Sequence, residues 1–130
     1  MKNEITVHNA SLLQVIEDRS LGEIIKPLVN EIHLFDTYIA GTAYIENHAV
    51  FDTLKKKDRL KMRREDSKFD DNAILVLNEN NEKLGYIPEK DNLIFSRLMD
   101  AGKLLVAIVD DIEVKGSFVK IRIGIYLIDY

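Results

Sequence analysis

The alternation of apolar and polar residues near the C-terminus constrains the fold of this chain most. Between Phe118 and Ile128 the apolar side chains occupy every second position and alternate with polar ones such as Lys120 and Arg122. A period of two places the apolar set on one face of a β-strand. The segment therefore predicts a long, half-buried strand, and a similar one is expected at Lys103–Val114, before a turn at residues 115–117.

The same period recurs upstream and predicts a mainly β (α+β) domain over residues 34–130. Further strands are expected at 33–40, 59–63, 73–77 and 82–87, and one helix at 90–101 with Leu93, Ile94, Leu98 and Ala101 facing inward. Gly102 is expected in the left-handed region just past the end of this helix. Five to six strands and one late helix predict a small OB-like or SH3-like β-barrel, closed or nearly closed.

Residues 1–33 are predicted to form a helical N-terminal extension. Ser11 is a plausible N-cap, and a second apolar stripe runs from Leu21 to Ile32 with Pro27 expected to kink it, while residues 1–8 are either a short strand or a loose terminus. The stripe could cover the barrel or pair with a second subunit. A homo-oligomer formed through these helices is therefore one expected assembly.

Composition excludes several classes of protein. The chain has 130 residues, enough for one core, and no cysteine for a disulfide or a thiolate metal site. No apolar run is long enough to cross a bilayer, and no signal peptide is recognisable, so we expect a cytoplasmic protein without a membrane partner. His8, His33 and His48 are isolated, and Asp70 and Asp71 are adjacent and would point apart. We therefore expect neither an enzyme nor a metal or other cofactor.

Positive charge is concentrated in one segment. Residues 55–68 contain 8 Lys or Arg against 3 Asp or Glu, although the whole chain has a net charge of −4. On a strand, Arg59, Lys61 and Arg63 would project from one face about 7 Å apart, close to the spacing of phosphates on an extended single strand. The alternative is a solvated strand face next to a lysine-rich turn.

Three short motifs follow one another in a fixed order: Tyr38–Tyr44, Arg63–Ile74 and Leu84–Pro88. They contain an aromatic residue after Gly-Thr-Ala, an Asp-Asn loop, and a Gly-aromatic turn, from which a single-strand nucleic-acid site can be built. Tyr44 and Tyr86 could stack on bases, because every base offers a flat face. The alternative for both tyrosines is packing in the core or at the barrel mouth.

The order and composition of these motifs resemble the HIRAN domain family, and in particular its stand-alone bacterial and phage members. The resemblance implies a β-barrel that binds single-stranded DNA at a free 3′-hydroxyl end in DNA repair or replication. It also implies that Asp70 accepts a hydrogen bond from the terminal 3′-hydroxyl while Phe69 packs near the last nucleotide. The residues expected to contact phosphates are Arg59, Lys61, Arg63 and Lys68, with Asn72 bracing the loop.

The chain departs from the eukaryotic end-binding members at three positions, where it has Ala43, Ile45 and Glu89. Such members tend to carry a basic residue before the first aromatic, a second aromatic after it, and a basic residue after the Gly-aromatic turn. The alternative function is a protein-interaction or oligomerisation module without end recognition.

Overall fold

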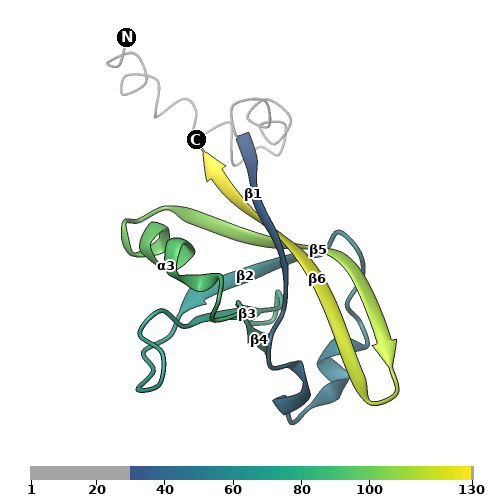
Figure 1. Cartoon of the computed structure of the whole chain (residues 1–130). Helices are drawn as coiled ribbons and strands as arrows, with labels where there is room; N and C mark the ends of the chain where they lie inside the picture. Colours follow the sequence, from purple (N-terminus) through teal and green to yellow (C-terminus); the bar gives the residue numbers. More distant parts are fainter. Residues whose placement is uncertain (1–29, 130) are drawn as a thin grey trace. The chain divides into compact units, whose positions relative to one another are not determined.

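Six strands and one α-helix make up residues 30–129, the part of the chain that the structure, a computed structural model, describes (Figure 1). The elements are β1 (Asn30–Tyr38), the 3-10 turns η2 (Thr42–Tyr44) and η3 (His48–Phe51), β2 (Arg59–Arg64), β3 (Ile74–Leu77), β4 (Lys83–Tyr86), α3 (Asn92–Asp100), β5 (Leu104–Lys115) and β6 (Phe118–Asp129). The predicted mainly β fold with a single late helix is confirmed for these residues.

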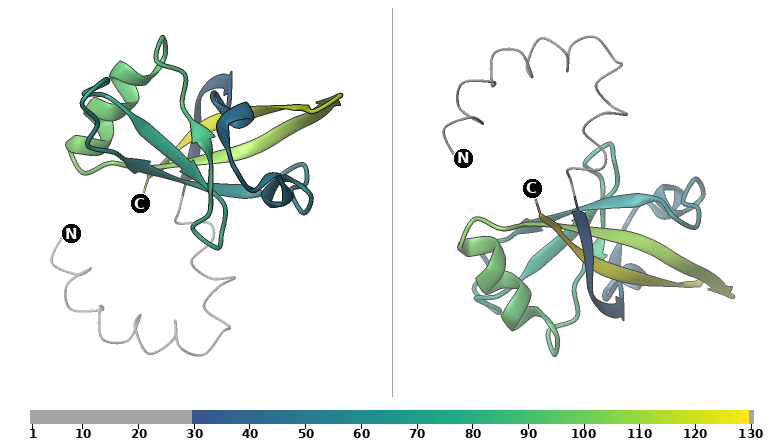
Figure 2. Two further views of the ribbon diagram at one scale, coloured as in Figure 1. Left: turned by 90° about the horizontal axis from the view of Figure 1, so that it is seen from below. Right: turned by 90° about the horizontal axis from the view of Figure 1, so that it is seen from above.

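The strands form one sheet in the order β1-β6-β5-β2-β3-β4. The hairpin of β5 and β6 is its longest pairing and runs from Leu104 opposite Ile128 to Lys115 opposite Phe118. Figure 2 shows the sheet curled around an interior, with α3 at one end. The two outer strands meet where Ala40 forms an isolated antiparallel bridge with Tyr86. The predicted barrel is therefore closed through a single bridge.

Gly85 permits this closure. Its φ is +155°, and a Cβ atom at this position would lie 2.3 Å from the carbonyl oxygen of Ala40 and 2.6 Å from Cγ2 of Ile39. Contacts this short do not occur for real Cβ atoms, so any side chain here would push the two backbones apart. The glycine of the third motif is needed for close backbone approach.

The core follows the alternation of the sequence. On β6, Ile121, Ile123 and Ile125 are buried, whereas Lys120 and Arg122 on either side of Ile121 are exposed; Gly124, between Ile123 and Ile125, is buried as well. All four residues of β3 are buried, as expected for a continuous apolar run. No helix among residues 30–129 is long and apolar enough to cross a membrane.

The predicted helix is present as α3, and it ends as expected. Gly102 has φ +89°, its N–H donates to the carbonyl of Met99, and the N–H of Lys103 donates to that of Leu98 at 3.0 Å. These two hydrogen bonds form the Schellman arrangement, which satisfies carbonyls that the helix leaves without partners.

The prediction of which residues of this helix face inward was wrong. Leu93 and Ile94 are 53% and 63% exposed, and the residues buried instead are Asn92, Phe95 and Ser96. Asn92 donates a side-chain hydrogen bond to Asp70, and Phe95 lies against Phe35 with ring centroids 5.8 Å apart. A pattern that counts only apolar residues misses a helix face that is held by polar side chains. Leu98 is half-buried, and Ala101 is exposed.

The N-terminal helical interpretation extended too far along the chain. Strand β1 begins at Asn30, so residues 30–33 are extended rather than helical, and Ile32 is exposed. Pairing with the long strand β6 overrides the local helical period of these residues. The predicted features at Ser11, Leu21 and Pro27 lie outside the described residues, and the division of the chain into an extension and a barrel domain stays a prediction.

Candidate nucleic-acid interface

The three sequence motifs meet where the barrel closes. Ala40 of the first motif and Tyr86 of the third exchange backbone hydrogen bonds of 2.8 and 2.9 Å. One residue further on, the N–H of Ile87 donates to the carbonyl of Ile74, the last residue of the second motif, at 3.0 Å. Closure therefore brings the second motif into one surface with the first and third, whose paired residues Ala40 and Tyr86 are 46 positions apart in the sequence.

A row of outward-facing residues crosses this surface. Arg63 lies opposite Leu75, Leu75 opposite Tyr86, and Tyr86 opposite Ala40. Opposed residues in a sheet point to the same face, and the residues next to them along the strands, including Val76 and Ile39, belong to the core. The closure row, defined as Arg63, Leu75, Tyr86 and Ala40, therefore lies on the face opposite the core, although Leu75 within it is only 8% exposed.

Tyr86 is held firmly within the closure row. Its hydroxyl donates to the carboxylate of Glu65 at 2.5 Å and accepts a hydrogen bond from Nζ of Lys83 at 2.9 Å. The same ammonium lies 4.4 Å from the centroid of the Tyr86 ring, which is a cation–π contact. Tyr86 is half-buried, so its side chain belongs to the surface at the closure and not to the core.

The loop between β2 and β3 is fixed from two sides. On one side, the carboxylate of Asp70 accepts two hydrogen bonds. Its Oδ1 accepts from the N–H of Asn72 at 2.9 Å, and its Oδ2 accepts from Nδ2 of Asn92 on α3 at 2.8 Å. The other side is Arg64, which donates to the carbonyls of Ala73 and Asp71 at 2.6 and 2.8 Å.

The guanidinium of Arg64 also pairs with Asp100 on α3 at 2.9 Å. This hydrogen bond holds the pKa of the Asp100 carboxyl below its usual value. The bracing role expected of Asn72 is carried mainly by Asp70 and Arg64, because Asn72 Oδ1 lies 3.4 Å from the Ser96 hydroxyl, which donates to Leu93 at 2.7 Å.

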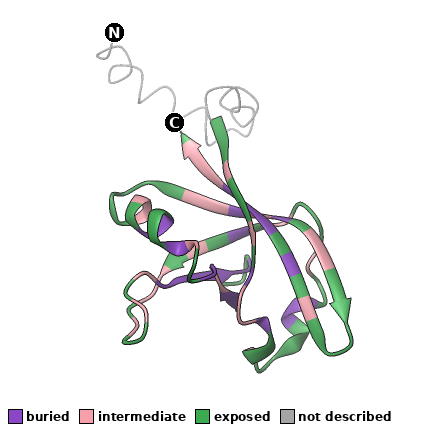
Figure 3. Ribbon diagram, viewed as in Figure 1, coloured by how far each residue is buried: buried purple, intermediate pink, exposed green. Residues whose placement is uncertain are grey.

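Two aromatic side chains of the first and second motifs stand in solvent. Phe69, in the fixed loop, is 96% exposed, and Tyr44, at the end of η2, is 89% exposed. In Figure 1 the loop lies at the lower left, below α3, and η2 lies at the bottom near the β5–β6 hairpin; Figure 3 shows the loop as a mixture of exposed and partly buried residues and η2 as mostly exposed. Core packing, the alternative interpretation of Tyr44, does not apply.

The predicted basic face of β2 is present, but its members differ in availability. Arg59, Lys61 and Arg63 are exposed and alternate with Leu60 and Met62 as expected. Arg59 pairs with Glu31 at 2.5 Å, and Lys61 donates to the side chain of Asn81 at 2.9 Å. Within residues 30–129, Arg63 and Lys68 form neither an ion pair nor a side-chain hydrogen bond. Of the four cations predicted to contact phosphates, these two are therefore free to meet one.

Sequence reasoning missed three residues at this surface, namely Arg64, Glu65 and Lys83. A signal for Arg64 exists, because it shares the inward parity of Leu60 and Met62 on β2. An inward arginine must find acceptors, since burying an unpaired charge is costly. In the part of the chain that the structure describes, no group of three or more His, Asp or Glu side chains is placed to hold a metal ion.

Known proteins with a similar sequence or fold identify the family of this chain. The HIRAN domain model matches residues 32–127. A solved protein structure from Lactobacillus plantarum is similar at 26% identity and a TM-score of 0.73, covering 78% of this chain and 99% of that one. The HIRAN domain of human HLTF shares the fold at 14% identity and a TM-score of 0.60, covering 75% of this chain and 78% of that one. Among curated proteins none matches the chain. Because the family model spans well over half of the sequence, the chain belongs to the HIRAN domain family.

Proposed function

We propose that this HIRAN domain is a non-catalytic module that binds single-stranded DNA, at a free 3′-hydroxyl end, in a repair or replication process. Membership of the family implies a nucleic-acid-binding module. The observation that carries the finer proposal is the fixed loop, which holds Asp70 by two hydrogen bonds and leaves the adjacent residue, Phe69, in solvent. A loop braced in this way presents its aromatic ring without further ordering when a base arrives.

Stacking and charge supply the affinity in this proposal. Phe69 and Tyr44 would each stack on a base, which contributes about 1–3 kcal/mol per base. Arg63 and Lys68 would neutralise phosphates beside them. Each contact on a single strand adds about 0.7 to the slope of log affinity against log salt, so these two give a slope of about −1.4.

Asp70 is proposed to distinguish an end from an internal linkage. A carboxylate accepts a hydrogen bond from a hydroxyl but repels a phosphate. Each oxygen of Asp70 already accepts one hydrogen bond from within the protein. A carboxylate has about four acceptor sites, so a sugar hydroxyl can still be accommodated.

Fluorescence anisotropy at low salt tests this role, with one single-stranded oligonucleotide ending in either a 3′-hydroxyl or a 3′-phosphate. We expect wild type to prefer the hydroxyl. Asp70→Ala should lose the preference, but it also releases the loop from α3. Asn92→Ala is the matched control, because it removes the same brace and keeps the carboxylate. Equal loss in both variants, or no preference in wild type, would contradict end recognition by Asp70.

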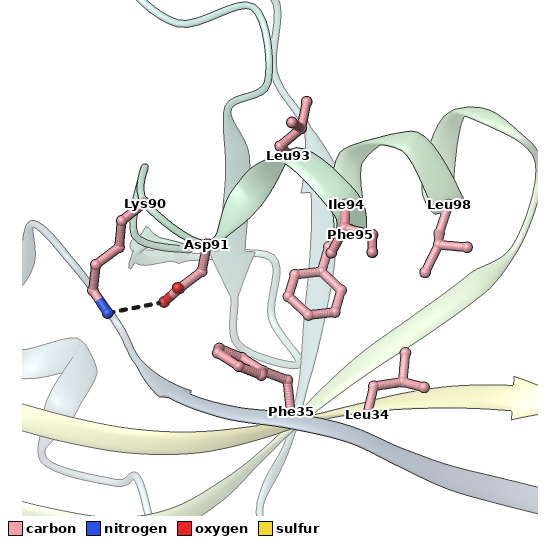
Figure 4. Close-up of a pocket in the computed structure, with 8 residues that line it drawn as sticks. All are labelled: Leu34, Phe35, Lys90, Asp91, Leu93, Ile94, Phe95 and Leu98. Atoms are coloured by element: carbon pink, nitrogen blue, oxygen red, sulfur yellow. Dashed lines mark ion pairs between the residues drawn. The ribbon is translucent and has the colours of Figure 1, made fainter.

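A second candidate function, self-assembly, is favoured by an apolar pocket between β1 and α3. The pocket has a volume of about 540 Å³, and Phe35 and Phe95 face each other across it while Leu98 lies further along (Figure 4). Its rim includes Ile94, which is 63% exposed. An apolar face of a second copy would fit there. Sedimentation of the full chain tests this: a wild-type oligomer that Ile94→Lys converts to a monomer supports assembly, and a wild-type monomer excludes it.

A further inference from the structure

Besides the apolar pocket, a polar pocket lies on the outer face of β1 and β6. It has a volume of about 290 Å³ and is lined by Asp36, Thr37, Tyr38, Lys90, Lys120 and Arg122. Three of these six side chains are cations, and they come from two segments that are far apart in the sequence. Neither Lys120 nor Arg122 lies in the basic segment at residues 55–68.

This pocket continues the closure row onto the next strand. The N–H of Ile39 donates to the carbonyl of Ile121 at 2.9 Å, and both of these residues are buried in the core. Lys120 and Arg122 flank Ile121 and therefore face outward beside Ala40, the last member of the row. Neighbouring strands are about 4.8 Å apart, so the cations lie within one strand spacing of the row.

The two cations of β6 are available to an anion. Their opposite residues on β5 are the carboxylates of Glu113, facing Lys120, and Asp111, facing Arg122. Those carboxylates pair instead with Lys115 at 3.2 Å and with Lys56 at 3.6 Å. Within the described part of the chain, Lys120 and Arg122 have no ion-pair partner and donate no side-chain hydrogen bond.

The other two charged residues of the pocket, Asp36 and Lys90, each have a partner within the protein. Asp36 is 2.7 Å from the ring of His33, and Lys90 is 3.4 Å from Asp91. Nζ of Lys90 also lies 5.7 Å from the ring centroid of Tyr38, which is 37% exposed. The pocket therefore combines two uncommitted cations with an accessible aromatic ring, the combination by which proteins hold single strands.

We propose that Lys120 and Arg122, beside Tyr38, form a second phosphate subsite that extends the DNA track past the closure onto β1 and β6. This inference rests on the proposed function. The strand would run across the sheet from Arg63, over Tyr86 and Ala40, to the pocket. Arg122 can hold a phosphate through two parallel hydrogen bonds, and Lys120 acts as a point charge beside it.

The test is the salt dependence of binding of a labelled oligothymidine by the full chain. Wild type is compared with the double variant Lys120→Gln/Arg122→Gln and with Arg97→Gln/Lys103→Gln, which removes the same charge from exposed positions on and after α3. All four positions are exposed, so thermal melting should be unchanged. We expect the first variant to bind more weakly and its slope to become shallower by about 1.4, for two lost contacts.

The control variant should keep the wild-type slope to within about half of one contact. If both variants bind with the affinity and the salt slope of the wild type, the second subsite is overturned and the proposed function is left intact. Absence of binding by the wild type would overturn both. An equal change in both variants would show a nonspecific effect of net charge and would also overturn the subsite.

Discussion

Ala40 and Tyr86 exchange both of their backbone hydrogen bonds, at 2.8 and 2.9 Å, and so join the two outer strands of the sheet. The same pair brings the first and third sequence motifs together. One residue along the chain, Ile87 adds the second motif through its hydrogen bond to Ile74. The closure of the fold and the assembly of the candidate interface are therefore one structural event, and damage to the closure should remove both.

Gly85→Ala is expected to lower the free energy of unfolding by about 2 kcal/mol or more, because the new Cβ would overlap the carbonyl of Ala40. Urea unfolding measures this. Gly116→Ala is the matched control, since Gly116 also has a positive φ, of +62°, but no atom within 4 Å of the added carbon. It should cost only about 1 kcal/mol, the strain of the left-handed backbone. Equal losses in the two variants would contradict the close-approach account.

Arg63 and Arg64 are expected to behave in opposite ways although they are adjacent. Arg64→Gln removes an ion pair and two hydrogen bonds to loop carbonyls, so it should destabilise the protein by about 1–3 kcal/mol. Arg63→Gln, at an exposed position without a partner among residues 30–129, should change stability by less than about 0.5 kcal/mol and weaken DNA binding. Urea unfolding and anisotropy are measured on both. A destabilised Arg63→Gln with unchanged DNA affinity would reverse these assignments.

The Arg64–Asp100 pair predicts a specific dependence of stability on pH. The hydrogen bond from Arg64 lowers the pKa of Asp100 in the folded protein, so the ionised carboxylate favours folding. This contribution is complete above the unfolded pKa of about 3.9 and is lost as the pH falls through the lower folded value. The difference in unfolding free energy between wild type and Asp100→Asn should be constant near neutral pH. It should shrink below about pH 4. A difference that persists unchanged to lower pH would refute the pair's role.

Phe69→Ala and Tyr44→Ala are expected to separate binding from folding. Both rings are almost fully exposed, so the free energy of unfolding of each variant should lie within about 0.5 kcal/mol of that of the wild type. Each should lose about 1–3 kcal/mol of affinity for single-stranded DNA if its ring stacks on a base. Val114→Ala, at a position that is 68% exposed on the β5–β6 hairpin, is the control and should affect neither property. Unchanged affinity in both aromatic variants would remove stacking from the mechanism.

The barrel could be predicted from the sequence because its strands obey a simple period. Ile121, Ile123 and Ile125 recur at every second position after Lys120, and the buried run of β3 is apolar throughout. Gly102 indicated the end of α3 because only a few residues tolerate the left-handed conformation there. The inner face of α3 could not be predicted in this way, since it is fixed by the hydrogen bond of Asn92 to Asp70, which lies 22 residues away.

Which side chains of the basic strand are exposed could be predicted from the sequence, but the partners that they contact could not. The exposure of Arg59 and Lys61 follows from strand parity, whereas their engagement with Glu31 and Asn81 depends on tertiary contacts. The pocket with Lys120 and Arg122 was likewise hidden, because only closure of the sheet places β6 beside the motifs. Local pattern specifies which side chains face outward, and topology specifies which of them meet.

The most direct test of the account is a map of backbone amide NMR shifts on addition of a 3′-hydroxyl single-stranded oligonucleotide. We predict that the largest changes lie in residues 40–44, 63–70 and 85–87, which surround the closure, with smaller ones at 120–122. Changes concentrated on residues 93–98, beside the apolar pocket, would contradict the account. No changes at low salt and a large excess of DNA would contradict it equally.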